Sequence, residues 1–211
     1  GLIPSGDYLL NEIGIMDDRR IMIYTSNLMD LSPQEPAHND RLTILNGSRI
    51  VFRSELNPGL SAIDFKGTDI LLKGFAQYIN SGGTGELRLV KKGQDLDVAL
   101  ALIEELGIIG HIKWLSEMPL AEFYKEMTAA DLVCDQFGTS FPGGVTLDAY
   151  ALGRPVMAKL RPEIFGSIFP EALPGFNAET PEEIANYLMM MEKNRDILVD
   201  VGQKSRAFAE A

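Results

Sequence analysis

From about residue 42 onward, short apolar runs rich in β-branched residues alternate with longer stretches of helical periodicity. This alternation favours a parallel sheet flanked by helices, because parallel strands need a long crossover connection that is usually a helix. We therefore expect an α/β fold built on one doubly wound parallel sheet. The predicted strands span 42–52, 86–91, 111–115, 131–136 and 155–160, with a weaker sixth at 175–177.

Two predicted helices have clear boundary signals. Residues 95–106 begin with acidic side chains, which stabilise the positive end of the helix dipole, and are followed by Gly107, a common helix stop. At 180–183, the order Thr-Pro-Glu-Glu combines an N-cap residue, a proline in the first turn and a glutamate that completes a capping box. A last helix over about 195–209 has no stop signal, so we expect the native chain to continue beyond it.

The first 41 residues differ from the rest of the chain. A strand-like apolar stretch at 21–24 is followed by a proline-containing loop at 32–36. This leading segment, 1–41, is either the end of a preceding domain or an edge strand of the domain formed by 42–211. It starts without Met and has neither the basic region nor the apolar core of a signal peptide, so we expect a trimmed chain.

The composition excludes several classes of protein. The chain has 211 residues, of which 45% are apolar, as in ordinary globular domains. Its 19 basic and 30 acidic side chains give a net charge of -11, which argues against nucleic acid as a partner. The longest aliphatic run, 98–103, is far too short to span a membrane. We expect a cytoplasmic protein.

Cysteine and histidine are scarce in this chain. The single cysteine, Cys134, lies in a predicted apolar strand and is expected to be a packed core thiol. His38 and His111 are expected to be a surface residue and a strand residue. Because no cluster of ligand side chains has the spacing of a metal site, we expect no metal.

The loop after the fourth predicted strand has the strongest signal for ligand binding. It spans 135–148 and runs through Gly143 and Gly144 directly into a predicted helix. Glycines let a ligand approach the backbone, and the exposed N–H groups of a helix start favour a phosphate. The alternative is a flexible loop whose glycines only serve turn geometry.

Basic residues follow other predicted strands and should lie at the same edge. Arg49 and Arg53 fall near the end of the first strand, and 91–93, Lys-Lys-Gly, follow the second. Lys66 directly precedes a helix that opens with Thr and Asp. Taken singly, each cation is explained as a solvated surface residue. Together they predict a local anion site in an otherwise acidic protein.

Three motifs occur in a recognisable order: KGTDILL at 66–72, WLSEM at 114–118 and GVTLDAYALGRPV at 144–156. The set resembles the carboxy-terminal, donor-nucleotide-binding domain of retaining glycosyltransferases with the GT-B fold, of the "glycosyl transferases group 1" type. The resemblance covers roughly 42–211. It implies a Rossmann-like domain that forms the carboxy-terminal half of a GT-B protein.

The resemblance also implies roles for individual residues. Arg49, with Arg53 as the alternative, and Lys66 match the catalytic pair that contacts the donor diphosphate. Asp148 matches a glutamate that binds the ribose hydroxyls, and Ser140 stands where the family has a first acidic residue eight positions earlier. Main-chain contacts to the base map to Leu115 and Ser116, and backbone contacts to the diphosphate map to Gly143 and Gly144. The implied donor-binding set is Gly93, Leu115, Ser116, Ser140, Pro142, Gly143, Gly144, Val145 and Asp148.

The implied reaction is transfer of a hexosyl group from a nucleoside diphosphate sugar to an acceptor hydroxyl with retention, as in polysaccharide biosynthesis. Cations and backbone amides would stabilise the departing diphosphate, so neither a cofactor nor a metal is expected. The acceptor, a saccharide or lipid, would bind through a missing amino-terminal domain, without which this chain is expected to be inactive. The full-length protein could then be peripheral to the membrane. The alternatives are a non-catalytic nucleotide-sugar-binding or interaction domain and, third, a nucleotide-sugar epimerase.

Overall fold

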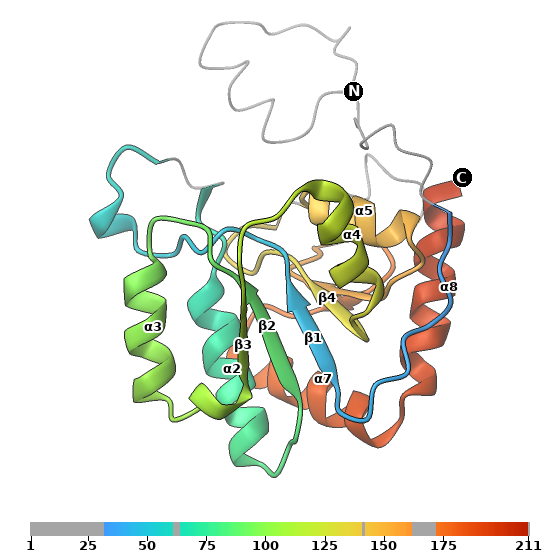
Figure 1. The fold of residues 1–211 in the computed structure, drawn as a ribbon, viewed down its shortest axis with the longest axis horizontal. Coiled ribbons are helices and arrows are strands. Elements are labelled where there is room, and N and C mark those ends of the chain that lie inside the picture. Colours follow the sequence, from blue (N-terminus) through green and yellow to red (C-terminus); the bar gives the residue numbers. More distant parts are fainter. Residues whose placement is uncertain (1–31, 61–63, 141, 162–171, 211) are drawn as a thin grey trace, which may run out of the picture.

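The computed structural model describes residues 32–60, 64–140, 142–161 and 172–210. Its centre is a six-stranded sheet in which each strand is parallel to its neighbours, with the order β3-β2-β1-β4-β5-β6 (Figure 1). This order is that of a doubly wound Rossmann-like sheet, which confirms the predicted fold class. The strands are β1 (Thr43–Asn46), β2 (Glu86–Val90), β3 (Ile112–Leu115), β4 (Leu132–Cys134), β5 (Val156–Ala158) and β6 (Phe176–Asn177).

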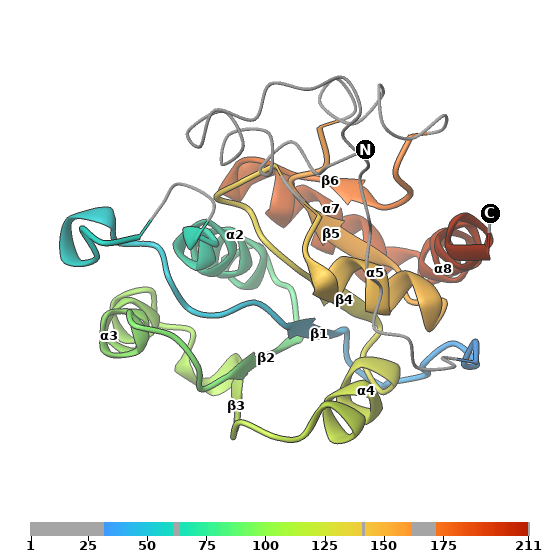
Figure 2. The same cartoon turned by 90° about the horizontal axis from the view of Figure 1, so that it is seen from above.

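Helices cover both faces of the sheet (Figure 2). One face is covered by α2 (Thr68–Asn80), α3 (Leu96–Glu105) and α7 (Pro181–Lys193). The other is covered by α4 (Leu120–Thr128), α5 (Gly144–Ala151) and α8 (Asp196–Glu210). Two short 3-10 turns, η1 (Ser54–Leu56) and η3 (Ile109–His111), complete the described elements.

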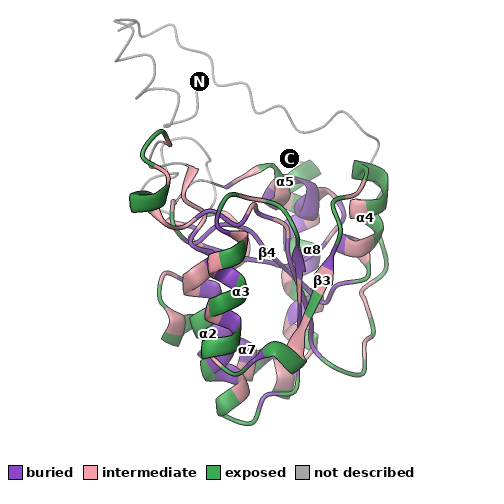
Figure 3. Cartoon of the chain, turned by 60° about the vertical axis from the view of Figure 1, so that its left-hand side comes forward, coloured by how far each residue is buried: buried purple, intermediate pink, exposed green. Residues whose placement is uncertain are grey.

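The core forms where the sheet meets these two helical layers. All four residues of β1 are buried, as expected for a central parallel strand, and buried positions follow the sheet and the helix faces turned toward it (Figure 3). Gly74 lets α2 and α7 approach closely, because a Cβ at this position would lie 2.7 Å from Cβ of Ile184. The predicted capping box starts α7: Thr180 Oγ1 accepts from the Glu183 amide, and the Glu183 side chain accepts from the Thr180 amide.

The first strand is much shorter than the predicted 42–52. It ends at Asn46, after which the chain leaves the sheet and runs over the loop between β2 and α3. There the Ile50 amide donates to the Lys92 carbonyl at 2.7 Å, and the Asp95 amide donates to the Ile50 carbonyl at 3.1 Å. Ile50 and Val51 are fully buried, so this apolar run is core-forming loop rather than strand. The other strands begin or end within two residues of their predicted limits.

The described part of the leading segment, 32–41, contains no strand and lies against the domain as an extended chain. The guanidinium of Arg154, which is only 1% exposed, donates to the carbonyls of Gln34 at 2.6 Å, of Glu35 and of Thr128 at 3.3 Å. The Asn39 side chain donates to the Ala129 carbonyl at 3.0 Å. The strand-like stretch at 21–24 lies outside the described residues. Across the part of the chain that is described, no helix has both the length and the apolar character needed to cross a membrane.

Candidate functional site

The predicted site residues cluster around the point where the connections of the sheet change direction. From β1 the chain runs outward through β2 to β3, and it then returns to β4 on the other side of β1. Open α/β sheets bind ligands beyond the carboxyl ends of the strands at such a switch point. The loops that leave β1 and β4, 47–53 and 135–143, meet there.

A buried carboxylate, Asp135, joins these two loops. Its side chain is 3% exposed and accepts three hydrogen bonds: from Ser48 Oγ at 2.6 Å, from the Gly143 amide at 2.8 Å and from Thr146 Oγ1 at 2.7 Å. Sequence reasoning placed Asp135 at a strand end but gave it no role. The available signal was an acidic residue that ends a buried strand shortly before a glycine pair and a threonine.

The start of α5 presents backbone donors next to this carboxylate. The Gly143 amide is engaged by Asp135, so it is not free for the diphosphate contact predicted from the sequence. Among the described residues, no acceptor is found for the amides of Gly144 and Val145, and Gly144 is exposed. The first N–H groups of a helix lack intrahelical partners and carry the positive end of its dipole. This end of α5 can therefore receive an anion.

Lys66 lies at the end of β4, next to the same loop. Its Nζ donates to Gln136 Oε1 at 2.8 Å, and the residue is half-buried. Burial lowers the pKa of Lys66, the neighbouring Asp135 carboxylate raises this pKa, and the nearby Arg49 lowers it. The structure therefore places Lys66 within electrostatic reach of both Arg49 and Asp135.

The backbone around Lys66 is fixed by close contact with the loop after β4. The amides of Phe137 and Gly138 donate to the Lys66 carbonyl at 2.7 and 3.1 Å. Gly67 has a positive φ of 69°, and a Cβ there would lie 2.4 Å from the Gly138 nitrogen. Glycine is required at 67 for both reasons, which explains the Lys-Gly order of the motif.

The structure separates the two candidate arginines after β1. Nη2 of Arg49 lies 3.3 Å from Oδ1 of Asp64, and Arg49 is near enough to affect the pKa of Lys66. The Arg53 side chain instead pairs with Glu55 of η1, while the Arg53 amide donates to the buried Asp95 carboxylate at 2.8 Å. Arg49 is therefore the cation that the fold brings to Lys66, and Arg53 is not.

Two other groups of predicted residues lie farther along the same edge. Gly93, with a φ of 130°, packs against the loop that follows β1. A Cβ on Gly93 would lie 2.2 Å from the backbone oxygen of Ile50. Leu115 ends β3, an edge strand, and Ser116 follows it; the Leu115 carbonyl accepts from the Lys91 amide at 2.9 Å. Gly93 therefore has a structural role in joining two loops, whatever else it contacts.

The remaining predicted positions belong to the α5 region. Pro142 is buried and Ser140 is half-buried, just before the helix begins. Asp148 lies within α5 and is 5% exposed. These residues share one loop and helix with the Gly144 and Val145 amides described above.

The surroundings of Cys134 agree with its expected role, whereas His111 ends η3 and is not the strand residue that was expected. Cys134 is fully buried in β4, and burial raises the pKa of its thiol. Nδ1 of His111 lies 3.0 Å from the Gly85 carbonyl, which is an ordinary structural contact. Within the described ranges, no group of three or more His, Cys, Asp or Glu side chains could hold a metal ion.

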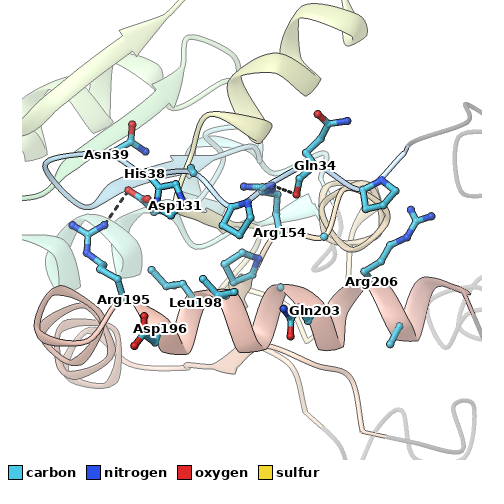
Figure 4. A pocket seen from close by; sticks show the side chains of 18 of the residues that line it. Gln34, His38, Asn39, Asp131, Arg154, Arg195, Asp196, Leu198, Gln203 and Arg206 are labelled. Carbon is cyan, nitrogen blue, oxygen red and sulfur yellow. Dashed lines mark hydrogen bonds and ion pairs between the residues drawn. The ribbon is translucent and has the colours of Figure 1, made fainter.

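A cavity of about 550 Å³ lies away from this site, between residues 33–40 and α8 (Figure 4). It borders the segments that enter β4 and β5, at the opposite end of the strands from Lys66. In Figure 4, Arg195 pairs with Asp131, with 3.2 Å between Nη1 and Oδ2, and Arg206 projects from α8. The predicted site residues do not line this cavity.

No family model and no curated protein matches the chain. Solved structures do match it. TarM of S. aureus, in a complex that includes UDP, has a TM-score of 0.69 at 16% identity over 98% of this chain. The pneumococcal O-GlcNAc transferase GtfA, in complex with UDP and GlcNAc, has a TM-score of 0.64 at 13% identity over 98% of this chain. Anabaena HepE, in complex with UDP-glucose, has a TM-score of 0.58 at 20% identity over 99% of this chain.

The chain spans less than half the length of each of these proteins: 39% of TarM, 40% of GtfA and 49% of HepE. At such low sequence identities, the similarity to these structures establishes the fold alone. The match to about half of each chain is what the predicted carboxy-terminal half requires. The chain therefore has the Rossmann-like fold of one half of a GT-B glycosyltransferase.

Proposed function

We propose that this chain is the donor-binding half of a glycosyltransferase that moves a sugar from a nucleoside diphosphate sugar to an acceptor hydroxyl with retention. The observation that carries the proposal is the convergence of Lys66, Arg49 and the start of α5 at the switch point of the sheet. Two cations and a helix N-terminus offer positive charge and N–H donors to an anion, next to the carboxylates of Asp64 and Asp135, in a chain with a net charge of -11.

The chemical demand of this reaction is the negative charge that grows on the departing diphosphate. Lys66 and Arg49 supply positive charge, and the Gly144 and Val145 amides supply donors that need no reorganisation during the reaction. Such preorganised groups stabilise developing charge without a proton relay. In this proposal the side chains and amides, rather than a metal ion, hold the diphosphate.

The other donor contacts follow from the sequence resemblance. Leu115 and Ser116 would contact the base, and Asp148 would accept hydrogen bonds from the ribose hydroxyls. UDP is the first nucleotide to test, because complexes of TarM, GtfA and HepE contain UDP or a UDP-sugar. The acceptor, a saccharide or a lipid, would bind to the other half of the protein, on the cytoplasmic side.

Binding without transfer is the second candidate function. Ser140 favours it, because the related transferases have an acidic residue at this position and Ser140 carries no charge. A nucleotide-sugar-binding domain would keep the diphosphate contacts and lose turnover. A transfer assay on the full-length protein separates the two functions, since both predict donor binding.

A calorimetric and thermal-shift panel of UDP, GDP, ADP and their sugars tests the proposed donor site. We expect one nucleoside diphosphate to stabilise the chain and to bind far more weakly to Lys66→Ala. Lys204→Ala is the matched control, because Lys204 is exposed on α8 and pairs with Asp200 at 2.6 Å. If none of the nucleotides binds, or if both variants bind like the parent, the proposal is wrong.

A further inference from the structure

Two consecutive buried polar residues follow β4, where a buried strand leads into the site. Asp135 is 3% exposed and Gln136 is 2% exposed. Burying a carboxylate or an amide is costly unless hydrogen bonds replace the lost water. Both side chains have such bonds, and the two sets of bonds lead to different halves of the proposed diphosphate site.

Asp135 holds the half of the proposed diphosphate site that consists of backbone amides at the start of α5. Its Oδ2 accepts from the Gly143 amide and from Thr146 Oγ1, on either side of Gly144 and Val145, the first two residues of α5. Its Oδ1 accepts from Ser48 Oγ in the loop after β1. A Cβ on Gly143 would lie 2.8 Å from Asp135 Oδ2, so a side chain at 143 would displace this carboxylate from its present position.

Gln136 holds the other half of the proposed diphosphate site, the ammonium of Lys66. Its Oε1 accepts from Lys66 Nζ at 2.8 Å, and its backbone carbonyl accepts from the Lys159 amide at 3.0 Å. The second bond ties Gln136 to the residue that follows β5, so the acceptor for Lys66 is carried by the sheet itself. A lysine has four rotatable side-chain bonds, and a fixed acceptor restricts where its ammonium can lie.

We propose that Asp135 and Gln136 are the positioning residues of the diphosphate site: Asp135 fixes the first turn of α5, and Gln136 fixes the ammonium of Lys66. The ligand in this inference rests on the proposed function. Neither side chain needs to touch the ligand. Two adjacent residues that directly follow β4 would then set the spacing between the amide donors and the cation.

Charge and geometry make opposite predictions for Asp135, which makes its role measurable. As a charge alone, this carboxylate repels a diphosphate, so removing it by any substitution should strengthen binding. As a positioning group, it acts through the acceptor oxygen that holds Gly143 and Thr146. Asp135→Asn keeps that oxygen, and its amide group can donate to Ser48 Oγ, whereas Asp135→Ala keeps neither.

The first experiment measures amide hydrogen exchange in the chain without ligand. We expect Asp135→Ala to speed exchange of the hydrogen-bonded amides of Gly143, Thr146 and Leu147 by about tenfold or more, and Asp135→Asn to stay near the parent. Thr146→Val, which removes one of the three bonds and keeps the side-chain shape, should give an intermediate rate if Asp135→Ala fails to fold. Unchanged exchange in Asp135→Ala and Thr146→Val would overturn the role of Asp135 without reference to any nucleotide.

The second experiment titrates UDP, uridine and inorganic pyrophosphate. We expect Asp135→Ala to weaken UDP and pyrophosphate binding by about tenfold, with Asp135→Asn within about threefold of the parent and uridine unaffected in both. If Asp135→Asn binds UDP as weakly as Asp135→Ala, the acceptor oxygen that Asn keeps does not hold the site, and the positioning role is wrong. If both variants bind UDP more tightly than the parent, Asp135 acts only as a repelling charge, and the positioning role is again wrong. If the parent binds UDP normally and Asp135→Ala binds it equally well, this inference is wrong and the proposed function stands.

Gln136 is tested through the residue on which it acts. Gln136→Met keeps the length of the side chain and removes the acceptor, and we expect UDP affinity to fall about three- to tenfold. In the Lys66→Ala background the same substitution should have no further effect, because its target is gone. Additive losses in this cycle would show that Gln136 does not act through Lys66. A parent that binds neither UDP nor pyrophosphate would instead overturn the proposed function, and with it the ligand role of both residues.

Discussion

Replacing Lys66 with methionine removes the ammonium and keeps most of the apolar stem. A lysine and a phosphate charge about 4 Å apart attract each other by about 4 kcal/mol at an effective dielectric constant of about 20. Lys66 is half-buried, and the water that solvates its ammonium and the phosphate must leave when a ligand binds, which reduces the net gain. Charge-assisted hydrogen bonds contribute about 1.5–3 kcal/mol in practice, so we expect Lys66→Met to weaken UDP binding by about 10- to 150-fold.

Isothermal titration of UDP and uridine against the parent, Lys66→Met and Lys204→Met measures this loss. Uridine has no phosphate, so its affinity should be the same for all three proteins. The exposed Lys204 should contribute nothing to either ligand. Equal UDP affinity for Lys66→Met and the parent, or an equal loss for uridine, would refute the assignment of Lys66 to the diphosphate.

The protonation of Lys66 adds a second readout for the same side chain. Burial lowers the pKa of Lys66 below that of an ordinary lysine, and the charged form exists only below that pKa. UDP affinity should therefore decline as the pH rises through the lowered pKa, at a lower pH than an exposed lysine would give. Lys66→Arg keeps its charge throughout this range, so any UDP binding it retains should be free of this decline. A decline of the same size in Lys66→Arg would assign the titration to another group.

Three further predictions concern the ribose contact and the stability of the fold. Asp148→Ala should weaken UDP binding by about 1.5–3 kcal/mol and weaken 2′-deoxy-UDP less; additive losses in this calorimetric cycle would show that Asp148 does not contact the 2′-hydroxyl. Thr180→Ala removes the N-cap of α7 and should lower the free energy of unfolding in urea by about 0.5–2 kcal/mol, whereas Thr84→Ser should not. Arg161 and Lys159 lower the pKa of Glu179 from 4.5 to about 2, so the stability that Glu179 gives should be present above about pH 4.5 and disappear as the pH falls toward 2. Unfolding curves of Glu179→Gln that differ equally from the parent at pH 7 and pH 2 would contradict this.

Most of the fold could be predicted because its signals are local. Strand centres, the order of elements and the capping box at Thr180 follow from periodicity and from residue preferences within a few positions. The prediction made the first strand too long because Ile50 and Val51 are as apolar as strand residues. They are buried by the loop between β2 and α3, and periodicity along the chain cannot show that contact.

The site could be predicted only in part, for a related reason. Lys66, Arg49 and the glycine pair were found because their residue types indicate anion binding and their order matches known motifs. Asp135 was missed as a functional residue because its partner Ser48 is 87 positions away in the sequence, and an acidic strand end has no distinctive pattern. The Gly143 amide was assigned to a ligand because its protein acceptor could not be seen before the loop was folded.

The buried guanidinium of Arg154 decides where this half of the protein can be separated from whatever precedes it. A cut at the start of β1 would discard the Gln34 and Glu35 carbonyls and leave the guanidinium, among the three carbonyls described above, with that of Thr128. Removing the partners of a buried charge costs about 3–5 kcal/mol, a large share of the stability of a domain this size. The folding unit therefore begins about ten residues before its first strand, and a recombinant half that starts at residue 32 should fold where one that starts at 42 does not.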